Sequence, residues 1–350
     1  MRQLFVWISF ACLVVAACQS SQEMEPAIAF QQPANFPAPA YDFSRNPITN
    51  EGLKLGRKLF FDGILSRDGT ISCGSCHIPS SAFTQHGHDL SHGIDDKLTL
   101  RNSLPIMNLA WKRELFWDGG VFDLDFLAIA PIEAHNEMDE SIANVLEKLR
   151  NHPEYPALFE KAFGTGAISL ADFLKALSQF QLMAVSANSK YDKYIRKEGV
   201  QLDAQELAGL ALFQQKCASC HQGELFTDMS FRNNGLPVRR FRLNGQDTID
   251  VGRQHITLRP DDAFKFRVPS LRNVEITRPY MHDGRLRTLR QVLDHYSQGI
   301  VDSPTLDPAF RQGEKLGIAL SEEDKDKLIA FLRTLTDEDF IRNPLLQEPF

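Results

Sequence analysis

The chain has 350 residues, of which 43% are hydrophobic, and its formal net charge is −7. This length allows two domains, each with its own hydrophobic core. The acidic balance and the lack of a basic cluster exclude a typical nucleic-acid-binding protein. A mildly acidic surface suits a basic partner such as a small electron carrier.

The first segment is typical of an exported lipoprotein. Arg2 precedes an apolar run, residues 4–17, that is too short for a membrane-spanning helix. The run ends in VAAC, which resembles a bacterial lipobox. We therefore expect residues 1–17 to be a signal peptide and Cys18 to carry the lipid that anchors the protein to the membrane, with the chain in the periplasm. An ordinary signal peptide with a chance cysteine is the alternative.

Residues 18–45 are rich in Pro, Gln, Ser and Ala, and this composition predicts a flexible tether. Beyond it, apolar residues recur at helical spacing in several segments. These segments are 46–62, 139–151, 169–186, 203–216 and 321–335. The last two begin with pairs typical of a capping box. Because alternating strand patterns are scarce, the sequence predicts a mainly α-helical protein with long ordered loops.

Two short motifs carry the chemistry, CGSCH at residues 73–77 and CASCH at residues 217–221. Covalent haem attachment requires two thiols that react with the two vinyl groups of one porphyrin. The histidine that follows then lies under the iron as the proximal ligand. The motifs therefore predict two c-type haems, and the residues that hold them are Cys73, Cys76, His77, Cys217, Cys220 and His221.

Zinc is the structural alternative, because C-x-x-C pairs also build zinc sites. A zinc site does not require a histidine directly after each pair, however, and duplication in an exported chain opposes a thioredoxin-like redox motif. The cysteine count agrees with haem. Cys12 and Cys18 fall in the leader and at the lipid site, and the other four cysteines fall in the two motifs. No disulfide is expected.

The two halves of the chain form a coarse internal repeat. Each has a helix, a C-x-x-C-H motif, a long loop and an Asp-Gly pair next to an aromatic ring, at residues 117–119 and 282–284. This order predicts two cytochrome c-like haem domains, residues 46–195 and residues 196–350.

The ordered motifs resemble the bacterial diheme cytochrome c peroxidase family, which includes MauG-like methylamine-utilisation enzymes. The resemblance covers roughly residues 46–345. The sequence motifs on which it rests include LGRKLFFDGILSRDGTISCGSCH, LFWDGG, PIEAHNEM and FRVPSLRNVEITRPYMHDGRLRTLRQVLDHY. It implies that the N-terminal haem is the peroxide site and that the C-terminal haem transfers electrons.

The resemblance also implies catalytic residues. Glu137, in HNEM, matches the distal glutamate, which would take the first proton from peroxide and return it to the leaving oxygen. The alternative is a solvated acid before a helix. Trp117 matches the tryptophan between the haems, and it could equally be a core aromatic. The family's distal glutamine falls near Leu127, a departure that puts the orientation of peroxide in doubt.

Three further residues match positions around the haems: Arg267 near a haem propionate, His282 near the domain interface, and Arg101 close to the haems. For the sixth ligand of the first iron, the resemblance favours His92 in SHGI, with His86 and His88 as fallback ligands. An open first iron with three loop histidines is the alternative.

The sixth ligand of the second iron has two candidates. Typical peroxidases use methionine, and Met281 lies in YMHDG. Counting along the family pattern instead favours Tyr296 in VLDHY, which resembles the methylamine-utilisation enzymes. Tyr296 could also be a core aromatic on a helix face.

The family carries a calcium ion between its domains, bound by an Asn side chain, two backbone carbonyls and waters. Asn102, Thr277 and Pro279 match those positions. Oxygen ligands of this kind suit calcium. The alternative is a turn that contains an ordinary Asn and Pro.

The expected activity is reduction of hydrogen peroxide to water with electrons from a small c-type cytochrome or cupredoxin, in an enzyme that the resemblance makes a homodimer. Two other functions stay open. Peroxide-driven oxidation of residues in a partner protein is favoured by Tyr296. A non-enzymatic diheme electron carrier is favoured by Leu127 and by a permanently closed first iron.

Overall fold

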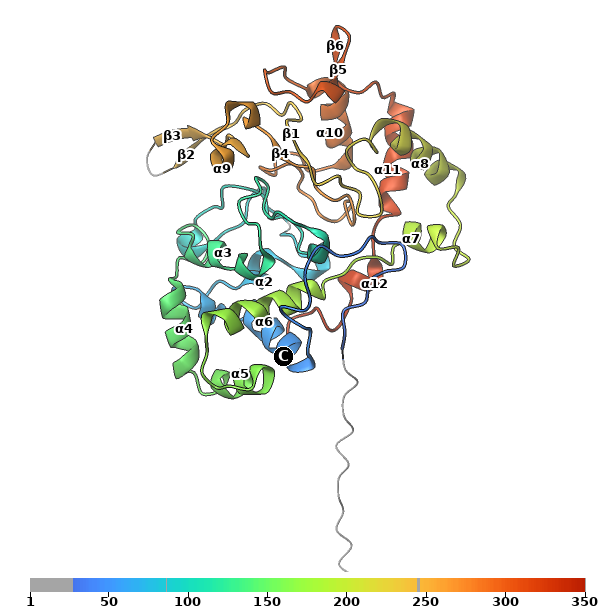
Figure 1. Cartoon of the computed structure of the whole chain (residues 1–350). Helices are drawn as coiled ribbons and strands as arrows, with labels where there is room; N and C mark the ends of the chain where they lie inside the picture. The colour runs from blue at the N-terminus through green and yellow to red at the C-terminus, as the bar shows by residue number, and fades with distance from the viewer. Residues whose placement is uncertain (1–27, 86, 244–245, 350) are drawn as a thin grey trace, which may run out of the picture.

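The structure is a computed structural model that describes residues 28–85, 87–243 and 246–349. Within these ranges the chain is mainly α-helical with long ordered loops, as the sequence predicts. Figure 1 shows two bodies, one built from the first half of the chain and one built largely from the second. The first haem motif begins with α2 (Cys73–Cys76), and the second follows α8 (Ala204–Lys216).

The helices of the first half surround its core. They are α1 (Asn50–Phe61), α2, α3 (Ile129–Glu133), α4 (Ile142–Asn151), α5 (Tyr155–Phe163) and α6 (Leu170–Leu182). Three predicted helices are thereby confirmed, in α1, α4 and α6. Their starts are fixed by the side chains of Thr49, Ser141 and Ser169, which each accept a hydrogen bond from a backbone N–H in the first turn.

The second half combines helices with short strand pairs. Its helices are α7 (Lys190–Ile195), α8, α9 (Gln254–Thr257), α10 (Leu289–Asp294), α11 (Glu322–Arg333) and α12 (Glu338–Ile341). Three antiparallel pairs join β1 (Phe231–Arg232) to β4 (Phe266–Arg267), β2 (Arg240–Leu243) to β3 (Gln246–Ile249), and β5 (Arg311–Gln312) to β6 (Lys315–Leu316). The predicted helices α8 and α11 are confirmed, and both begin with a capping box.

Single 3-10 turns occupy parts of the long loops. They lie at Gly63–Leu65, Pro79–Ser81, Ile94–Asp96, Leu109–Trp111, Leu124–Phe126, Pro260–Asp262 and Pro308–Phe310. A π-helical turn, His295–Gly299, follows α10 directly. Turns of this kind often occur at functional sites.

In each half, the helix before the haem motif crosses a later helix at a glycine. A Cβ atom on Gly56 of α1 would lie 1.9 Å from the carbonyl oxygen of Ala176 in α6. A Cβ atom on Gly209 of α8 would lie 2.0 Å from the carbonyl oxygen of Lys327 in α11. Only glycine permits these approaches, so the two halves use the same packing device.

Residues 28–45 lie against the first body, although their composition suggests a free tether. Phe36 is buried, and its ring lies 5.0 Å from that of Trp111. The indole Nε1 of Trp111 donates to the carbonyl oxygen of Pro37 at 2.7 Å. Burial of aromatic surface by distant residues holds this segment in place, and composition alone does not reveal it.

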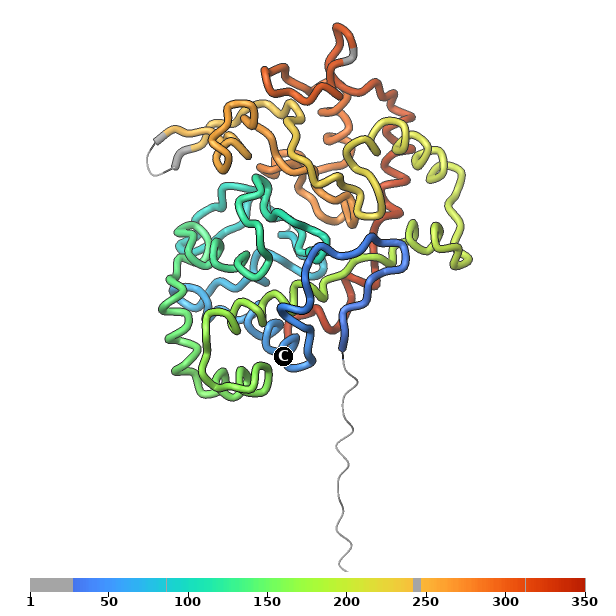
Figure 2. Tube along the Cα trace, in the orientation of Figure 1, coloured from blue at the N-terminus to red at the C-terminus, as the bar shows by residue number. Residues whose placement is uncertain are grey.

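The C-terminal residues return to the first body. Phe340 of α12 and the nearby Leu346 are buried in the core of the first half. The ring of Phe340 lies 5.8 Å from that of Phe83. Figure 2 shows the red end of the trace beside the blue and green segments. The domain boundary at residue 195 stays a prediction, and the last residues of the chain cross it.

The predicted signal peptide, the lipid site at Cys18 and the fallback ligand His86 lie outside the described residues. None of the helices in the described ranges combines the length and the apolar character needed to cross a membrane.

Candidate active site

The first haem motif presents its histidine on a fixed ring. The Nδ1 atom of His77 lies 2.7 Å from the carbonyl oxygen of Phe83, which leaves Nε2 for a ligand. Burial lowers the pKa of His77, so the imidazole stays neutral, as an iron ligand must be. Cys73 and Cys76 are half-buried and unpaired, and are available for thioether bonds.

The second motif repeats this arrangement with a different hydrogen bond. The Nδ1 atom of His221 lies 3.2 Å from two carbonyl oxygens, those of Phe226 and Pro269. Burial again lowers the pKa of the imidazole. Cys217 and Cys220 are unpaired. Across the described ranges, no three His, Cys, Asp or Glu side chains are arranged so that they could hold a metal ion.

Glu137 lies beside the first motif. Its carbonyl oxygen accepts from the backbone N–H of Ile94 at 2.8 Å, and the carbonyl of the neighbouring His92 lies 3.9 Å from Cys76 Sγ. The carboxylate is close enough to Cys73 and Cys76 to disfavour their thiolate forms. Burial raises the pKa of Glu137 above the ordinary value of a glutamate. A carboxyl group of this kind can both accept and return a proton.

The loop histidines contact one another. His92 Nδ1 lies 2.5 Å from Asp96 Oδ1, and His92 Nε2 lies 3.1 Å from His88 Nδ1. Both ring nitrogens of His92 are therefore engaged, and Nε2 must leave His88 before it can bind iron. Leu127 packs against the core of the first half.

Trp117 lies where the two halves meet. Its Nε1 donates to the carbonyl oxygen of Asn102 at 2.8 Å, and its own carbonyl oxygen accepts from the N–H of Arg267 at 2.7 Å. The indole is 8% exposed. The first half thus binds the indole N–H and the second half binds the backbone carbonyl, so Trp117 is fixed where the two halves meet.

Arg267 fits the carboxylate of a haem. Its Nε donates to the carbonyl oxygen of Phe116 at 3.1 Å, whereas Nη2 is buried and has no hydrogen-bond partner among the described residues. Burial lowers the pKa of Arg267 to about 10. An unpartnered buried guanidinium N–H is costly, and a haem propionate would satisfy it.

A buried charge cluster joins the halves next to Trp117. Arg101 Nη1 donates to Asp118 at 2.6 Å, and its Nε and Nη2 donate to Asp250 at 2.7 and 2.9 Å. His282 stacks on Phe266 with ring centroids 3.7 Å apart, and burial lowers its pKa to about 4, so it is neutral at pH 7. A cavity of about 320 Å³ opens beside this cluster.

Both candidate ligands of the second iron contact Asn234. The Nδ2 atom of Asn234 donates to Met281 Sδ at 3.3 Å, and its side chain also bonds Tyr296. Tyr296 lies in the π-helical turn, close enough to Cys217 and Cys220 to interact electrostatically with both. Burial raises the pKa of its phenol, and the Asn234 bond opposes that shift.

Two of the three predicted calcium ligands, Asn102 and Pro279, are in contact. The Nδ2 atom of Asn102 lies 2.7 Å from the carbonyl oxygen of Pro279, and Thr277 lies two residues before that proline. The side-chain oxygen of Asn102 is buried without a partner in the described part of the chain. A buried oxygen that lacks a donor fits a cation, and the oxygen donors here are those that calcium prefers.

The sequence alone did not reveal several neighbours of these residues. Asp250 and Asn234 lie in loops without a motif, and each reaches the site only through the fold. Lys112 is a third residue that the sequence alone did not reveal. Burial and the nearby charge of Arg267 lower its pKa to about 7. Asp118 could have been found, because it belongs to the quoted segment LFWDGG.

Two haem-attachment motifs, an acid beside the first and a phenol beside the second define a diheme c-type redox enzyme. The family model of di-haem cytochrome c peroxidases matches residues 50–199. The chain is 36% identical over 314 residues to the methylamine utilization protein MauG of Methylorubrum extorquens, which covers 88% of this chain and 84% of that protein. It is 30% identical over 375 residues to cytochrome-c peroxidase IdrP1 of a Pseudomonas species, at 99% and 94% coverage.

Among solved structures, a MauG-like protein associated with microbial copper homeostasis has a TM-score of 0.80 and 34% identity, covering 92% of this chain and 99% of that one. The chain thus belongs to the di-haem cytochrome c peroxidase family, as its motifs predict. It is an enzyme that acts on hydrogen peroxide and carries two c-type haems.

Proposed function

We propose that the chain reduces hydrogen peroxide at the first haem motif, with Glu137 as the acid and base. The observation that carries this proposal is the half-buried carboxyl group beside Cys73 and Cys76, with its raised pKa. When bound, the haems supply the iron that takes peroxide and the capacity to store electrons. Glu137 accepts the first proton of peroxide and returns it to the leaving oxygen.

Electrons come from a small donor protein, a c-type cytochrome or a cupredoxin, and enter through the second half. Trp117 relays them toward the first half, because Asn102 binds its indole N–H and Arg267 binds its backbone carbonyl from the other side of the interface. Arg267 holds a haem propionate, and neutral His282 and Arg101 complete the contact between the halves.

Tyr296 is our proposed sixth ligand at the second motif, and Met281 is the alternative. The electrostatic interaction of Tyr296 with Cys217 and Cys220 supports this choice, whereas Asn234 does not distinguish the two candidates, because its side chain contacts both. His92 is our proposed ligand at the first motif in the resting enzyme. Its release to His88 and Asp96 would open the site.

Calcium bound by Asn102, Thr277 and Pro279 would fix the interface next to Trp117. The unpartnered oxygen of Asn102 supports this site. We further propose a periplasmic location, because c-type haem is attached outside the cytoplasm, with a lipid anchor at Cys18 and a homodimer as the functional unit.

A second candidate is oxidation of residues in a partner protein. Tyr296 and the 36% identity to a methylamine utilization protein favour it. The structural neighbour associated with microbial copper homeostasis adds copper-linked physiology as a context for either activity.

The decisive experiment adds peroxide to the protein that lacks residues 1–18, with both haems confirmed. Fully ferric and half-reduced enzyme are compared, with and without a reduced small cytochrome c. We expect rapid donor oxidation, faster after half-reduction if His92 closes the ferric first site. A long-lived oxidised spectrum from the ferric form without donor turnover would instead support oxidation of a protein partner.

A further inference from the structure

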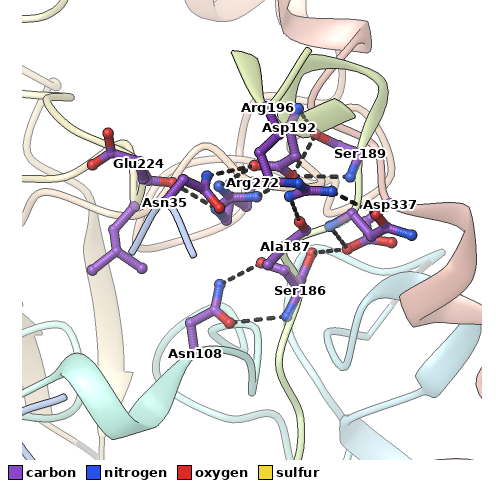
Figure 3. Close-up of polar contacts among 12 residues, drawn as sticks. Asn35, Asn108, Ser186, Ala187, Ser189, Asp192, Arg196, Glu224, Arg272 and Asp337 are labelled. Atoms are coloured by element: carbon purple, nitrogen blue, oxygen red, sulfur yellow. Dashed lines mark hydrogen bonds and ion pairs between the residues drawn. The ribbon is translucent and has the colours of Figure 1, made fainter. Parts of the chain in front are cut away.

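An ion pair that is fully removed from water joins α7 to the segment after β4. Arg272 Nη1 and Nη2 each donate to one oxygen of Asp192 at 2.8 Å, and both side chains are 0% exposed (Figure 3). Asp192 belongs to α7, and Arg272 follows β4. Taking two charges out of water is costly, and such a pair commonly adds little net stability. It therefore calls for a role other than stability.

Arg272 makes a third contact, which leads to the second haem motif. Its Nε donates to the carbonyl oxygen of Glu224 at 2.7 Å, three residues after His221. Two neighbouring bonds join the same segments: Ser270 Oγ donates to the carbonyl of Leu225 at 2.7 Å, and Thr227 Oγ1 donates to that of Val268 at 2.6 Å. Residues 224–227 are thus held against residues 268–272.

These two segments supply both carbonyls that face the proximal histidine. His221 Nδ1 lies 3.2 Å from the carbonyl oxygens of Phe226 and Pro269, one from each segment. The relative position of the segments therefore decides how the N–H of His221 is shared. Arg272 adds to the Ser270 and Thr227 bonds that fix this position, because it joins Glu224 on one side to Asp192 on the other.

The first half shows that the motif folds without this charge. Asn108 and Asn273 occupy matching places, with positive φ angles of 54° and 58°, and each bonds Ser186. The residue before Asn108 is Met107, which is buried, whereas the residue before Asn273 is Arg272. In the half with methionine, the carbonyl oxygen of Phe83 lies 2.7 Å from His77 Nδ1, and the backbone of Leu104 also hydrogen-bonds this imidazole.

Bonds that do not involve Arg272 also hold Asp192 in place. Its Oδ2 atom accepts from the backbone N–H and the hydroxyl group of Ser189, at 2.9 and 2.8 Å. Its Oδ1 atom lies 3.4 Å from Asn35 Nδ2 in the N-terminal segment. Asp192, to which Arg272 is anchored, therefore lies in α7 and outside the two segments, 224–227 and 268–272, that face His221.

We propose that Arg272, held by Asp192, is a positioning residue for the proximal ligand of the second haem. It keeps the N–H of His221 shared between two carbonyls and so sets the basicity of the imidazole, on which the reduction potential of that haem depends. The inference rests on the haem assignment of the second motif, and its consequence for turnover rests on the proposed electron-transfer role of that half.

The test uses the diheme holoprotein with the double substitution Arg272→Met and Asp192→Asn, which removes both charges and leaves no unpaired charge buried. A redox titration followed by visible spectroscopy, without peroxide, measures both haems. Without Arg272, residues 224–227 and 268–272 are held together less firmly, so the hydrogen bonds from His221 Nδ1 weaken and the basicity of the imidazole falls. We expect the potential of the second haem to rise, by up to a tenfold change in its ferric-to-ferrous ratio, or about 59 mV. The potential of the first haem should stay unchanged.

Arg272→Lys supplies the matched variant, because it keeps the charge but loses the fork that joins Asp192 to Glu224. We expect a shift in the same direction. Unchanged potentials in both variants, even with a lowered melting temperature, would overturn the proposal. A wild-type potential in Arg272→Lys with a shifted one in the double variant would also overturn it, because charge alone would then explain the effect. Neither measurement depends on peroxide turnover. Failure of this inference can therefore be told apart from failure of the proposed peroxidase function.

Discussion

The two haem motifs share their attachment chemistry and differ in almost everything that surrounds it. At the first, the carbonyl oxygen of Phe83 lies 2.7 Å from His77 Nδ1, and Glu137, whose pKa is raised by burial, lies beside the motif. At the second, His221 is shared between two carbonyls at 3.2 Å, and Tyr296 faces the site. A duplicated attachment unit can thus serve two chemical tasks when its second shell and its distal residues diverge.

The largest expected effect follows from replacing Glu137, the acid beside the first haem motif. Glu137→Gln keeps the shape of the side chain and removes the proton acceptor. We expect kcat/KM for peroxide to fall by about 10²- to 10⁴-fold, the usual contribution of general acid–base catalysis. Steady-state oxidation of a reduced cytochrome c measures it, and the potential of the second haem serves as the control. Activity close to that of the unaltered enzyme would remove Glu137 from the mechanism.

The same carboxyl group predicts a pH dependence. Burial raises the pKa of Glu137, and the base must be ionised to accept a proton. The rate of reaction with peroxide should therefore fall as the pH is lowered through this raised pKa, at a higher pH than for an ordinary glutamate. Stopped-flow rates of the half-reduced enzyme across pH report this limb, which should disappear in Glu137→Gln.

The next largest effect concerns the sixth ligand of the second haem, for which Tyr296 and Met281 are the candidates. Tyr296→Phe removes the phenol oxygen, so we expect a changed ferric absorption spectrum and a raised potential of the second haem. Met281→Leu is the matched control, since it removes the competing sulfur with little change in volume, and it should leave the ferric spectrum unchanged. The reverse pattern would assign the ligand to Met281.

A smaller effect concerns electron transfer between the two haem motifs. Trp117→Phe retains an aromatic ring but loses the bond to Asn102. We expect electron transfer between the halves to slow by about tenfold, which corresponds to about 1.4 kcal/mol in the barrier. Rapid-mixing measurements of each haem after reduction of the second resolve this step. Equal rates in both proteins would show that the electrons take another route.

The last expected effect concerns stability and not rate, and it follows from the loss of calcium. Binding to the folded state at 100 times the Kd stabilises a protein by about 2.7 kcal/mol. We expect added calcium to raise the melting temperature of the chelator-treated wild-type protein and not that of Asn102→Ala. An identical calcium response in the two proteins would place the ion elsewhere.

Local patterns predicted the helices well, because periodic apolar residues and caps act within a few positions of one another. Ser321 and Asp203 are examples, each at the start of a predicted helix. The missed features depend on long-range partners. Asp250 meets Arg101 across 149 positions, and Asp192 meets Arg272 across 80. No local pattern links such residues, and the buried aromatic contacts of residues 28–45 escaped for the same reason.

The placement of Phe340 and Leu346 in the first core has a consequence for biosynthesis. A chain is made from its N-terminus, so this core is incomplete until nearly the whole polypeptide has emerged. CGSCH at residues 73–77 therefore lies in a body whose core needs the last residues of the chain. A gene fragment that ends at residue 195 would leave that body permanently unfinished, with apolar surface exposed to aggregation.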